Sequence, residues 1–337
     1  MPSLPLPRGD ASAFVLERLR RDAHALPAVA PVAPPDPLAD DDLQLALHLC
    51  YELHYRGLPG VDELWEWEPS LLAFRAALER AFEDALLAEL GVPARGGGAP
   101  ETMDLALREI VEADDAPSLS SHLERDGTLE QVLEFVVHRS AYQLKEADPH
   151  SWAIPRLDGP PKAALVEIQA DEYGGGRPER VHAELFAVSM EALGLDRTYG
   201  AYLDHVPGVT LATVNLMSML GLHRRWRGAI VGHLAAFEMS SSVPNRRYAN
   251  ALRRLGFDAR ATGFFDEHVE ADAVHENVAA VDLAGGLARR EPALAGQILW
   301  GGRALVALEG RWARHLLEAW RRGESSLRVP LPSALPV

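Results

Sequence analysis

Residues 264–278 read FFDEHVEADAVHENV and carry His268, Asp272 and His275 at positions i, i+4 and i+7. On an α-helix these positions lie on one face, one above another. The segment has no Gly or Pro and is rich in Ala, Glu and Val, so a helix is the natural local structure. Two imidazoles and a carboxylate on one face form a site for a transition metal such as iron, manganese or zinc. Because further ligands must come from facing helices, this segment favours a helical bundle. The alternative is a solvated acidic helix face with incidental histidines.

The composition excludes several other classes of protein. The net charge of -16 argues against binding to nucleic acid or to an anionic membrane surface. Cys50 is the only cysteine, so an intrachain disulfide, a cysteine-based zinc site and an iron–sulfur cluster are all excluded. Any metal must therefore bind to histidines and carboxylates.

The chain shows no targeting or membrane signal. Its N-terminus, MPSLPLPRGDAS, lacks a charged segment followed by an apolar core, and no apolar run reaches the roughly 18 residues that a membrane helix needs. We therefore expect a cytoplasmic protein without a membrane partner.

Helical spacing dominates the whole chain, and strand signals are weak, which predicts an all-α fold. Residues 1–39 are expected to form an N-terminal arm and a Pro-rich linker, because about 25 residues cannot make a core of their own. Residues 40–325 are predicted to form one all-α domain, with accessory helices in 40–127 and a core in 128–322, and 326–337 are expected to be a tail. The expected helices cover residues 11–25, 40–55, 69–90, 101–113, 118–124, 128–146, 160–172, 178–193, 209–221, 224–255, 258–289 and 291–322.

Glu238 is the strongest further ligand candidate. It lies in the apolar stretch LAAFEMSS, where a carboxylate is costly unless it is paired or binds a metal. His233, which precedes it, is either an outer partner of the site or a core residue. Glu52 and His54 lie two positions apart and would point to different sides of a helix, so we assign them to packing or to a subunit contact.

Two more candidate regions precede Glu238 in the sequence. Glu146 ends a helix with apolar periodicity that Pro149 is expected to stop, with Asp148 and His150 just beyond it. Alternatively, Glu146 is a solvated residue beside Lys145. Glu172 ends another helix and is followed by three glycines, after which His182 begins the next helix. Alternatively, Glu172 is a surface carboxylate at a turn, and His182 is a core histidine bonded to a backbone carbonyl.

The charges of these candidates balance those of two ferrous ions. The four carboxylates bring four negative charges, two Fe(II) ions bring four positive charges, and three neutral imidazoles bring none. Seven protein ligands for two metals also leave open coordination positions, as oxygen chemistry requires. The grouped candidates are Glu146, Glu172, His182, Glu238, His268, Asp272 and His275.

In order and spacing these residues resemble the heme-oxygenase-like diiron oxidases and oxygenases, a family of iron-containing redox enzymes. The family pattern is a Glu, then a Glu and a His, then a Glu on a later helix, and finally a His-x3-Asp-x2-His helix. The resemblance covers about residues 128–322 and implies a seven-helix bundle, here with additional N-terminal helices. It implies that the seven grouped residues bind two Fe(II) ions, the second of them labile, and that O2 is a cosubstrate.

The resemblance leaves the reaction open. It implies a small-molecule substrate, and family analogy favours N-oxygenation of an amino-acid-derived amine. The alternatives are oxidative decarboxylation or desaturation of a fatty acid and C–C cleavage of an amino acid. Glu238 and Asp272 are the expected catalytic residues, and Asp148, Glu179 and Glu276 are candidate partners of the ligand histidines. The electron donor is unknown, since no flavin or nicotinamide motif occurs in the chain, and a homodimer is expected.

Two rival interpretations concern other classes of protein. A ferritin-like diiron protein would use Glu-x-x-His from two helices, but only Glu179 and His182 form such a motif. A metal-free thiaminase-like or binding protein on the same scaffold would need a core cysteine or a stacked aromatic pocket, and Cys50 lies outside the matching region.

Overall fold

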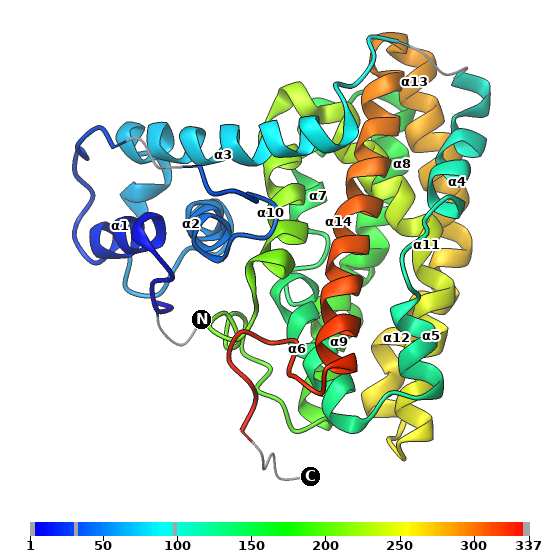
Figure 1. The fold of residues 1–337 in the computed structure, drawn as a ribbon. Helices are drawn as coiled ribbons and strands as arrows, with labels where there is room; N and C mark the ends of the chain where they lie inside the picture. Colours follow the sequence, from blue (N-terminus) through cyan, green and yellow to red (C-terminus); the bar gives the residue numbers. More distant parts are fainter. Residues whose placement is uncertain (1–3, 30–32, 97–99, 333–337) are drawn as a thin grey trace.

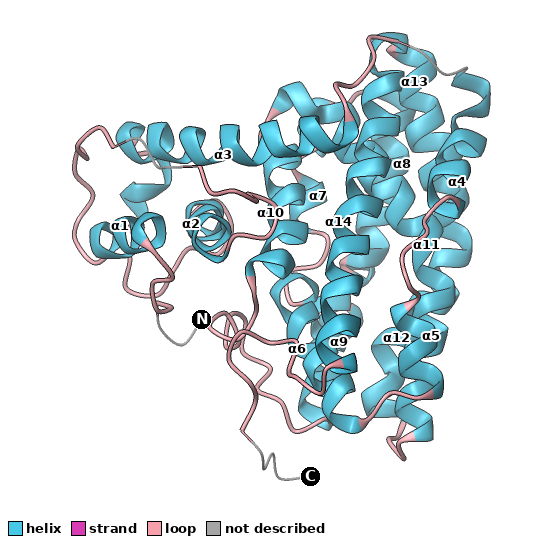
Figure 2. Cartoon of the chain, viewed as in Figure 1, coloured by secondary structure: helices cyan, strands magenta, loops and turns pink. Residues whose placement is uncertain are grey.

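The computed structural model describes residues 4–29, 33–96 and 100–332, without the side chains of 272–274. Within these residues the chain is helical and contains no strand (Figures 1 and 2), which confirms the all-α prediction. No helix among them is long and apolar enough to cross a bilayer. The longer helices of the core are α6 (Leu129–Gln143), α8 (Gly159–Glu172), α9 (His182–Ala192), α10 (Gly208–Leu222), α11 (Arg227–Arg254), α12 (Ala259–Asn277) and α14 (Ala295–Arg321).

Helix α11 is the centre of the bundle, since it packs along both α12 and α14. Figure 1 shows these three helices running side by side. Glycines allow α11 and α14 to approach closely. A Cβ atom on Gly232 would lie 1.8 Å from the carbonyl oxygen of Ile298, and one on Gly301 would lie 2.0 Å from that of Ala229. This contact fixes α11, and with it Glu238, relative to the rest of the bundle.

Replacing Gly232 by alanine should therefore destabilise the protein. The added methyl group meets a backbone carbonyl that no rotamer change can move, so we expect a loss near the upper end for overpacking, about 3 kcal/mol. The matched control is Gly263→Ala in α12, where an added Cβ meets nothing within 4 Å, and helix propensity should make that change neutral or stabilising. Urea unfolding measures both. Equal midpoints for Gly232→Ala and the wild type would contradict the close helix contact.

The N-terminal region packs on one side of the bundle. Its helices are α1 (Asp10–Leu19), α2 (Asp41–Glu52) and α3 (Pro69–Leu90). Helix α1 packs on α2, α2 packs on α10, and α3 crosses from α2 to α14 (Figure 1). A continuous apolar cluster joins these helices to the bundle, including Val15, Tyr51 and Phe82. The division of the chain into arm, accessory and core parts stays a prediction.

Shorter elements complete the fold. Helices α4 (Met103–Glu112) and α5 (Leu119–Arg125) lie along α14 and α11. The remaining helical segments are α7 (Asp148–Ser151), α13 (Gly286–Arg290), and the 3-10 helices Glu63–Trp67, Pro100–Thr102, Ile154–Arg156, Gly174–Gly176, Pro178–Arg180, Arg224–Trp226 and Pro292–Leu294.

The structure differs from the expected helices at two places near the predicted ligands. Helix α6 ends at Gln143, before Pro149 can act, and the chain turns through Ala147, whose φ is 74°. Glu146 therefore lies in this turn and not on a helix. The segment expected as one helix over 258–289 changes at Val278–Gly285 into a π-helix. A π-helix is rare and frequently lies at a functional site.

Candidate metal centre

The predicted ligands come together from five elements of the bundle. Glu146 lies in the turn after α6, and the others lie on α8, α9, α11 and α12. The six described members of the set are between 1% and 6% exposed. Asp272 lies between His268 and His275 on α12, but its side chain is outside the described residues. The described members are Glu146, Glu172, His182, Glu238, His268 and His275.

Four of these residues form one group of candidate ligands. Ligand atoms of Glu146, Glu172, His182 and His268 all lie within 4.8 Å of one another. His182 Nδ1 is 2.9 Å from Glu172 Oε2 and 3.2 Å from His268 Nε2. His268 Nε2 is 3.6 Å from Glu146 Oε2. Two carboxylates and two imidazoles thus converge on one point.

A second group shares a residue with the first. It consists of Glu172, Glu238 and His275, whose ligand atoms also lie within 4.8 Å of one another. His275 Nδ1 is 3.6 Å from Glu238 Oε2. Glu172 therefore belongs to both groups, and it would be a ligand that two neighbouring cations share.

Three glycines make the sharp turn that brings Glu172 opposite His182. Gly174, Gly175 and Gly176 all have φ between 59° and 78°, in the left-handed region that side chains disfavour. A Cβ atom on Gly174 would lie 2.6 Å from the carbonyl carbon of Arg180. The triplet therefore forms a tight turn between α8 and α9, and only glycine fits it without strain.

Burial shifts the acid–base properties of the centre. It raises the pKa of Glu146 above its ordinary value and that of Glu172 to about 7. It lowers the pKa of His182 to about 4, so this ring stays neutral. Burial would also lower the pKa of His275, but the carboxylates of Glu238 and Asp171 raise it to about 9. The metal-free centre therefore keeps protons that a bound cation would displace.

Unpaired buried atoms show that the donor set suits a cation. Glu146 Oε2, Glu172 Oε2 and His275 Nδ1 make no well-aligned hydrogen bond in the described part of the chain, although His182 Nδ1 lies 2.9 Å from Glu172 Oε2. Buried polar atoms normally have one, and their exceptions call for an explanation. A set of carboxylate oxygens and imidazole nitrogens suits iron or manganese. The only thiol, Cys50, is buried in α2, and burial raises its pKa to about 12.

The outer contacts of the histidines differ from the prediction. His275 Nε2 is 3.0 Å from Asp171 Oδ2, and His268 Nδ1 is 2.9 Å from the carbonyl oxygen of Phe264. Such contacts fix the orientation of a ligand ring. A sequence cannot single out one backbone carbonyl, whereas Asp171 was detectable as the acidic neighbour of Glu172.

The three residues predicted for this role have other surroundings. Asp148 accepts a hydrogen bond from Tyr173, and Glu276 pairs with Arg108, so the prediction is wrong for these two. Glu179 is exposed and forms no ion pair among the described residues. Only His182 of the Glu-x-x-His motif reaches the centre, which removes the basis of the ferritin-like interpretation.

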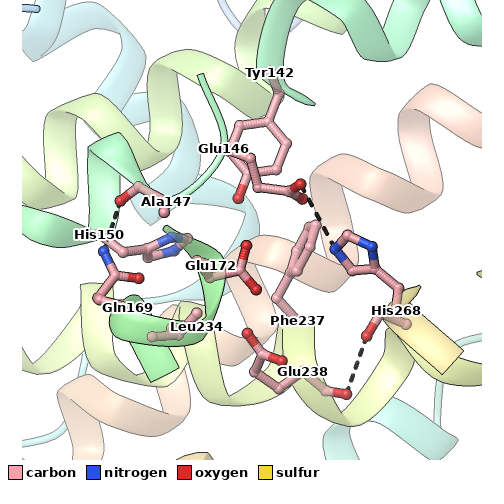
Figure 3. A pocket seen from close by; sticks show the side chains of 11 residues that line it. Tyr142, Glu146, Ala147, His150, Gln169, Glu172, Leu234, Phe237, Glu238 and His268 are labelled. Carbon is pink, nitrogen blue, oxygen red and sulfur yellow. Dashed lines mark hydrogen bonds and ion pairs between the residues drawn. The ribbon is translucent and has the colours of Figure 1, made fainter. Parts of the chain in front are cut away.

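A small cavity of about 10 Å³ adjoins both groups. Figure 3 shows the carboxylates of Glu146, Glu172 and Glu238 pointing into the same space as the ring of His268. His150 also borders this cavity, and burial lowers its pKa to about 3, so its ring is neutral. Its Nε2 is 3.1 Å from Nδ1 of His233, so these two histidines pair with each other outside the two groups.

A larger cavity of about 800 Å³ reaches Glu146 and His268 from the side of α5, α11 and α14. Its size is that of a pocket for a small organic ligand. The centre thus has a space for a molecule no larger than water and a separate approach for a substrate.

Comparison with known proteins identifies the family. The chain matches the family described as iron-containing redox enzyme over residues 133–310, just over half of its length. It is 29% identical over 136 residues to a nitrosourea synthase from Streptomyces achromogenes subsp. streptozoticus. That match covers 40% of this chain and 29% of the relative, so the chain spans less than a third of that protein. All six described members of the predicted set lie within 133–310. The resemblance seen in the sequence is thus confirmed, and the chain belongs to the iron-containing redox enzymes, with a heme-oxygenase-like helical fold.

Proposed function

We propose that this protein is a non-heme diiron oxygenase that uses O2 to oxidise a nitrogen atom of a small organic substrate. The observation that supports this most strongly is the pair of buried carboxylate–histidine groups that share Glu172, with a cavity of about 800 Å³ leading to them. Iron bound there would supply Lewis acidity and two electrons for the reduction of O2, and an external electron donor would return the irons to Fe(II) before the next turnover.

The proposed ligands divide between two ions. Glu146, His182 and His268 would hold one, Glu238 and His275 would hold the other, and Glu172 would contact both. Asp272, expected from its position on α12, would complete the second set or bridge to the first. Glu238 and Asp272 remain the proposed catalytic residues, because they would adjust the charge beside the reacting oxygen.

The protein residues have distinct roles in this proposal. Burial of all six described ligands excludes bulk water, which strengthens every charge interaction at the centre. Asp171 orients His275, and the Phe264 carbonyl orients His268. Because the pKa of Glu172 is raised to about 7, its carboxylate can hold a proton near neutral pH whenever it is not bound to a cation. Substrate would approach along the wall formed by Glu146 and His268, which face the large cavity.

The choice of nitrogen rests on the distant relative. Its name refers to a nitrosourea, a compound with a nitrogen–oxygen bond. An amino-acid-derived amine is the preferred substrate, while fatty-acid decarboxylation or desaturation and C–C cleavage of an amino acid are the competing reactions. An O2-uptake screen of reconstituted protein against amines, amino acids and fatty acids separates them. An N-hydroxylated product supports the proposal, and uptake that is coupled only to fatty acids would overturn it.

Iron binding should release protons in a defined pattern. Without metal, Glu172 has a pKa of about 7 and His275 of about 9, and both must lose their protons to bind a cation. Affinity for Fe(II) should therefore rise with pH. About one proton should be released per chain between pH 7 and 9, and about two below pH 7. Anaerobic titration in weak buffer with a pH indicator measures this release. Iron affinity that does not change between pH 6 and 9 would contradict the proposed roles of both residues.

A further inference from the structure

One face of α6 leads along the large cavity to the metal centre. Phe135, Arg139, Gln143 and Glu146 all line this cavity. Their spacings of four, four and three residues place them along one side of a helix and its continuing turn. A molecule in the cavity would therefore meet Arg139, Gln143 and the candidate ligand Glu146 in that order.

Gln143 has an unused polar group on this wall. Gln143 is only 9% exposed, and its side-chain Oε1 has no hydrogen-bond partner among the described residues. A buried acceptor left unpaired costs about 1–3 kcal/mol. Because Gln143 borders the cavity, a bound molecule can supply the missing N–H donor one turn away from Glu146.

Arg139 and Glu309 form a charged pair further from the centre. Arg139 on α6 donates to Glu309 on α14 through Nη1 at 3.0 Å and Nη2 at 2.7 Å. The guanidinium carbon lies 4.0 Å from the ring centre of Trp312. The two side chains are 16% and 24% exposed, and both residues line the cavity.

This pair is neutral as a whole, so it selects against a ligand with a single charge. A lone carboxylate would be attracted by Arg139 and repelled by Glu309, and a lone ammonium group would meet the reverse. A group that carries both charges on neighbouring atoms satisfies both partners at once. An aliphatic chain would instead cover the pair and Gln143 without replacing the hydrogen bonds of water.

We propose that the large cavity binds an elongated zwitterion. Its α-amino-acid head lies at the Arg139–Glu309 pair, an N–H group donates to Gln143 Oε1, and its far end lies beside Glu146 and His268. A helix rises about 6 Å from Arg139 to Gln143, and Glu146 is one further turn away, so the ligand spans roughly 10 Å. The inference deepens the proposed function and rests on it for the chemistry at the far end, whereas the binding itself needs no iron.

The test is ligand binding to the metal-free protein, measured by calorimetry. The probes are α,ω-diamino acids of increasing length from 2,3-diaminopropionate to lysine, cadaverine as the diamine without a carboxylate, and dodecanoate. Binding should strengthen with chain length toward lysine. Cadaverine should bind roughly tenfold more weakly than lysine or worse, the value of one lost charged contact. Dodecanoate binding tighter than every amino acid, or no binding by any amino acid at millimolar concentration, would overturn the inference.

Variants locate the binding residues. Glu309→Gln and Gln143→Leu should each weaken lysine binding roughly tenfold. The matched control is Glu89→Gln, which removes a carboxylate that also pairs with an arginine of α14, Arg311, but lies outside the cavity lining. Unchanged lysine binding by both cavity variants would contradict the assignment. Lysine binding in a protein that takes up no iron would refute the proposed function alone, and iron uptake without amino-acid binding would refute this inference alone.

Discussion

Replacing Glu172 by alanine should leave the protein with at most one iron per chain, where the proposed diiron site holds two. Glu172 belongs to both ligand groups, and without it one group keeps three described ligands and the other keeps two. Turnover should fall by more than about a hundredfold, because outer contacts of metal ligands alone account for 10- to 100-fold effects. Iron is measured after anaerobic reconstitution and desalting, and turnover is measured as O2 uptake.

The same substitution should not destabilise the metal-free protein. Glu172 is buried close to Glu146 and Glu238, and its raised pKa shows that its charged form is disfavoured there. Removing the Glu172 carboxylate removes the free-energy cost of burying its charge. Functional sites often carry such a cost, because their residues are selected for activity and not for stability. The control is Glu167→Ala, an exposed residue of the same helix, which should keep both ions. Two ions in Glu172→Ala would show that the shared carboxylate is wrongly assigned.

Replacing Glu52 by glutamine should destabilise the protein by about 3–5 kcal/mol, the cost of leaving a buried charge without its partner. Glu52 on α2 forms an ion pair with Lys145, and the two side chains are 0% and 1% exposed. Tyr199 donates a hydrogen bond of 2.7 Å to Glu52, and Lys145 Nζ lies 4.3 Å from the ring centre of Tyr55. Both charges are therefore shielded from bulk solvent, and Lys145 would keep its charge without its carboxylate partner.

A double variant separates the charge from the packing. Glu52→Leu combined with Lys145→Met removes both charges at similar volume, and most of the lost stability should return. The control is Asp115→Asn, which weakens the exposed pair with Arg314 and should cost less than about 1 kcal/mol. Urea unfolding measures all three. A cost of Glu52→Gln no larger than that of the control would contradict the account of the buried pair.

This pair links α2 to the turn that carries the candidate ligand Glu146. Glu52 lies outside the family match of 133–310, whereas Lys145 directly precedes the candidate ligand Glu146. The turn that carries Glu146 therefore depends on a charge from α2. We expect that Glu52→Gln also weakens iron binding, even where the protein remains folded.

Much of the fold followed from local signals in the sequence. Helix α3 covers Pro69–Leu90 as expected, and the segment that carries His268 and His275 is helical. The π-helix at Val278–Gly285 was not predicted, because its sequence VAAVDLAG has the same composition as an α-helix. The early end of α6 was also missed, since the burial of Lys145 against α2 depends on a residue 93 positions away.

The site was predictable to a similar degree. Glu238 was singled out as a candidate because a carboxylate in an apolar stretch needs a partner, and the spacing on α12 singled out His268 and His275. Glu146, Glu172 and His182 could be proposed as ligands only as a group, from their charge balance and from the family resemblance. Gln143 and Arg139 could not be found, since only the three-dimensional arrangement shows that they face a cavity.

The central claim is that two neighbouring groups bind two irons through a shared Glu172. The most direct measurement is the iron content and Mössbauer spectrum of protein reconstituted anaerobically with Fe(II) and then exposed to O2. The account predicts two irons per chain and a magnetically coupled pair after oxidation. Iron below one per chain, or iron that remains magnetically isolated at full occupancy, would contradict it.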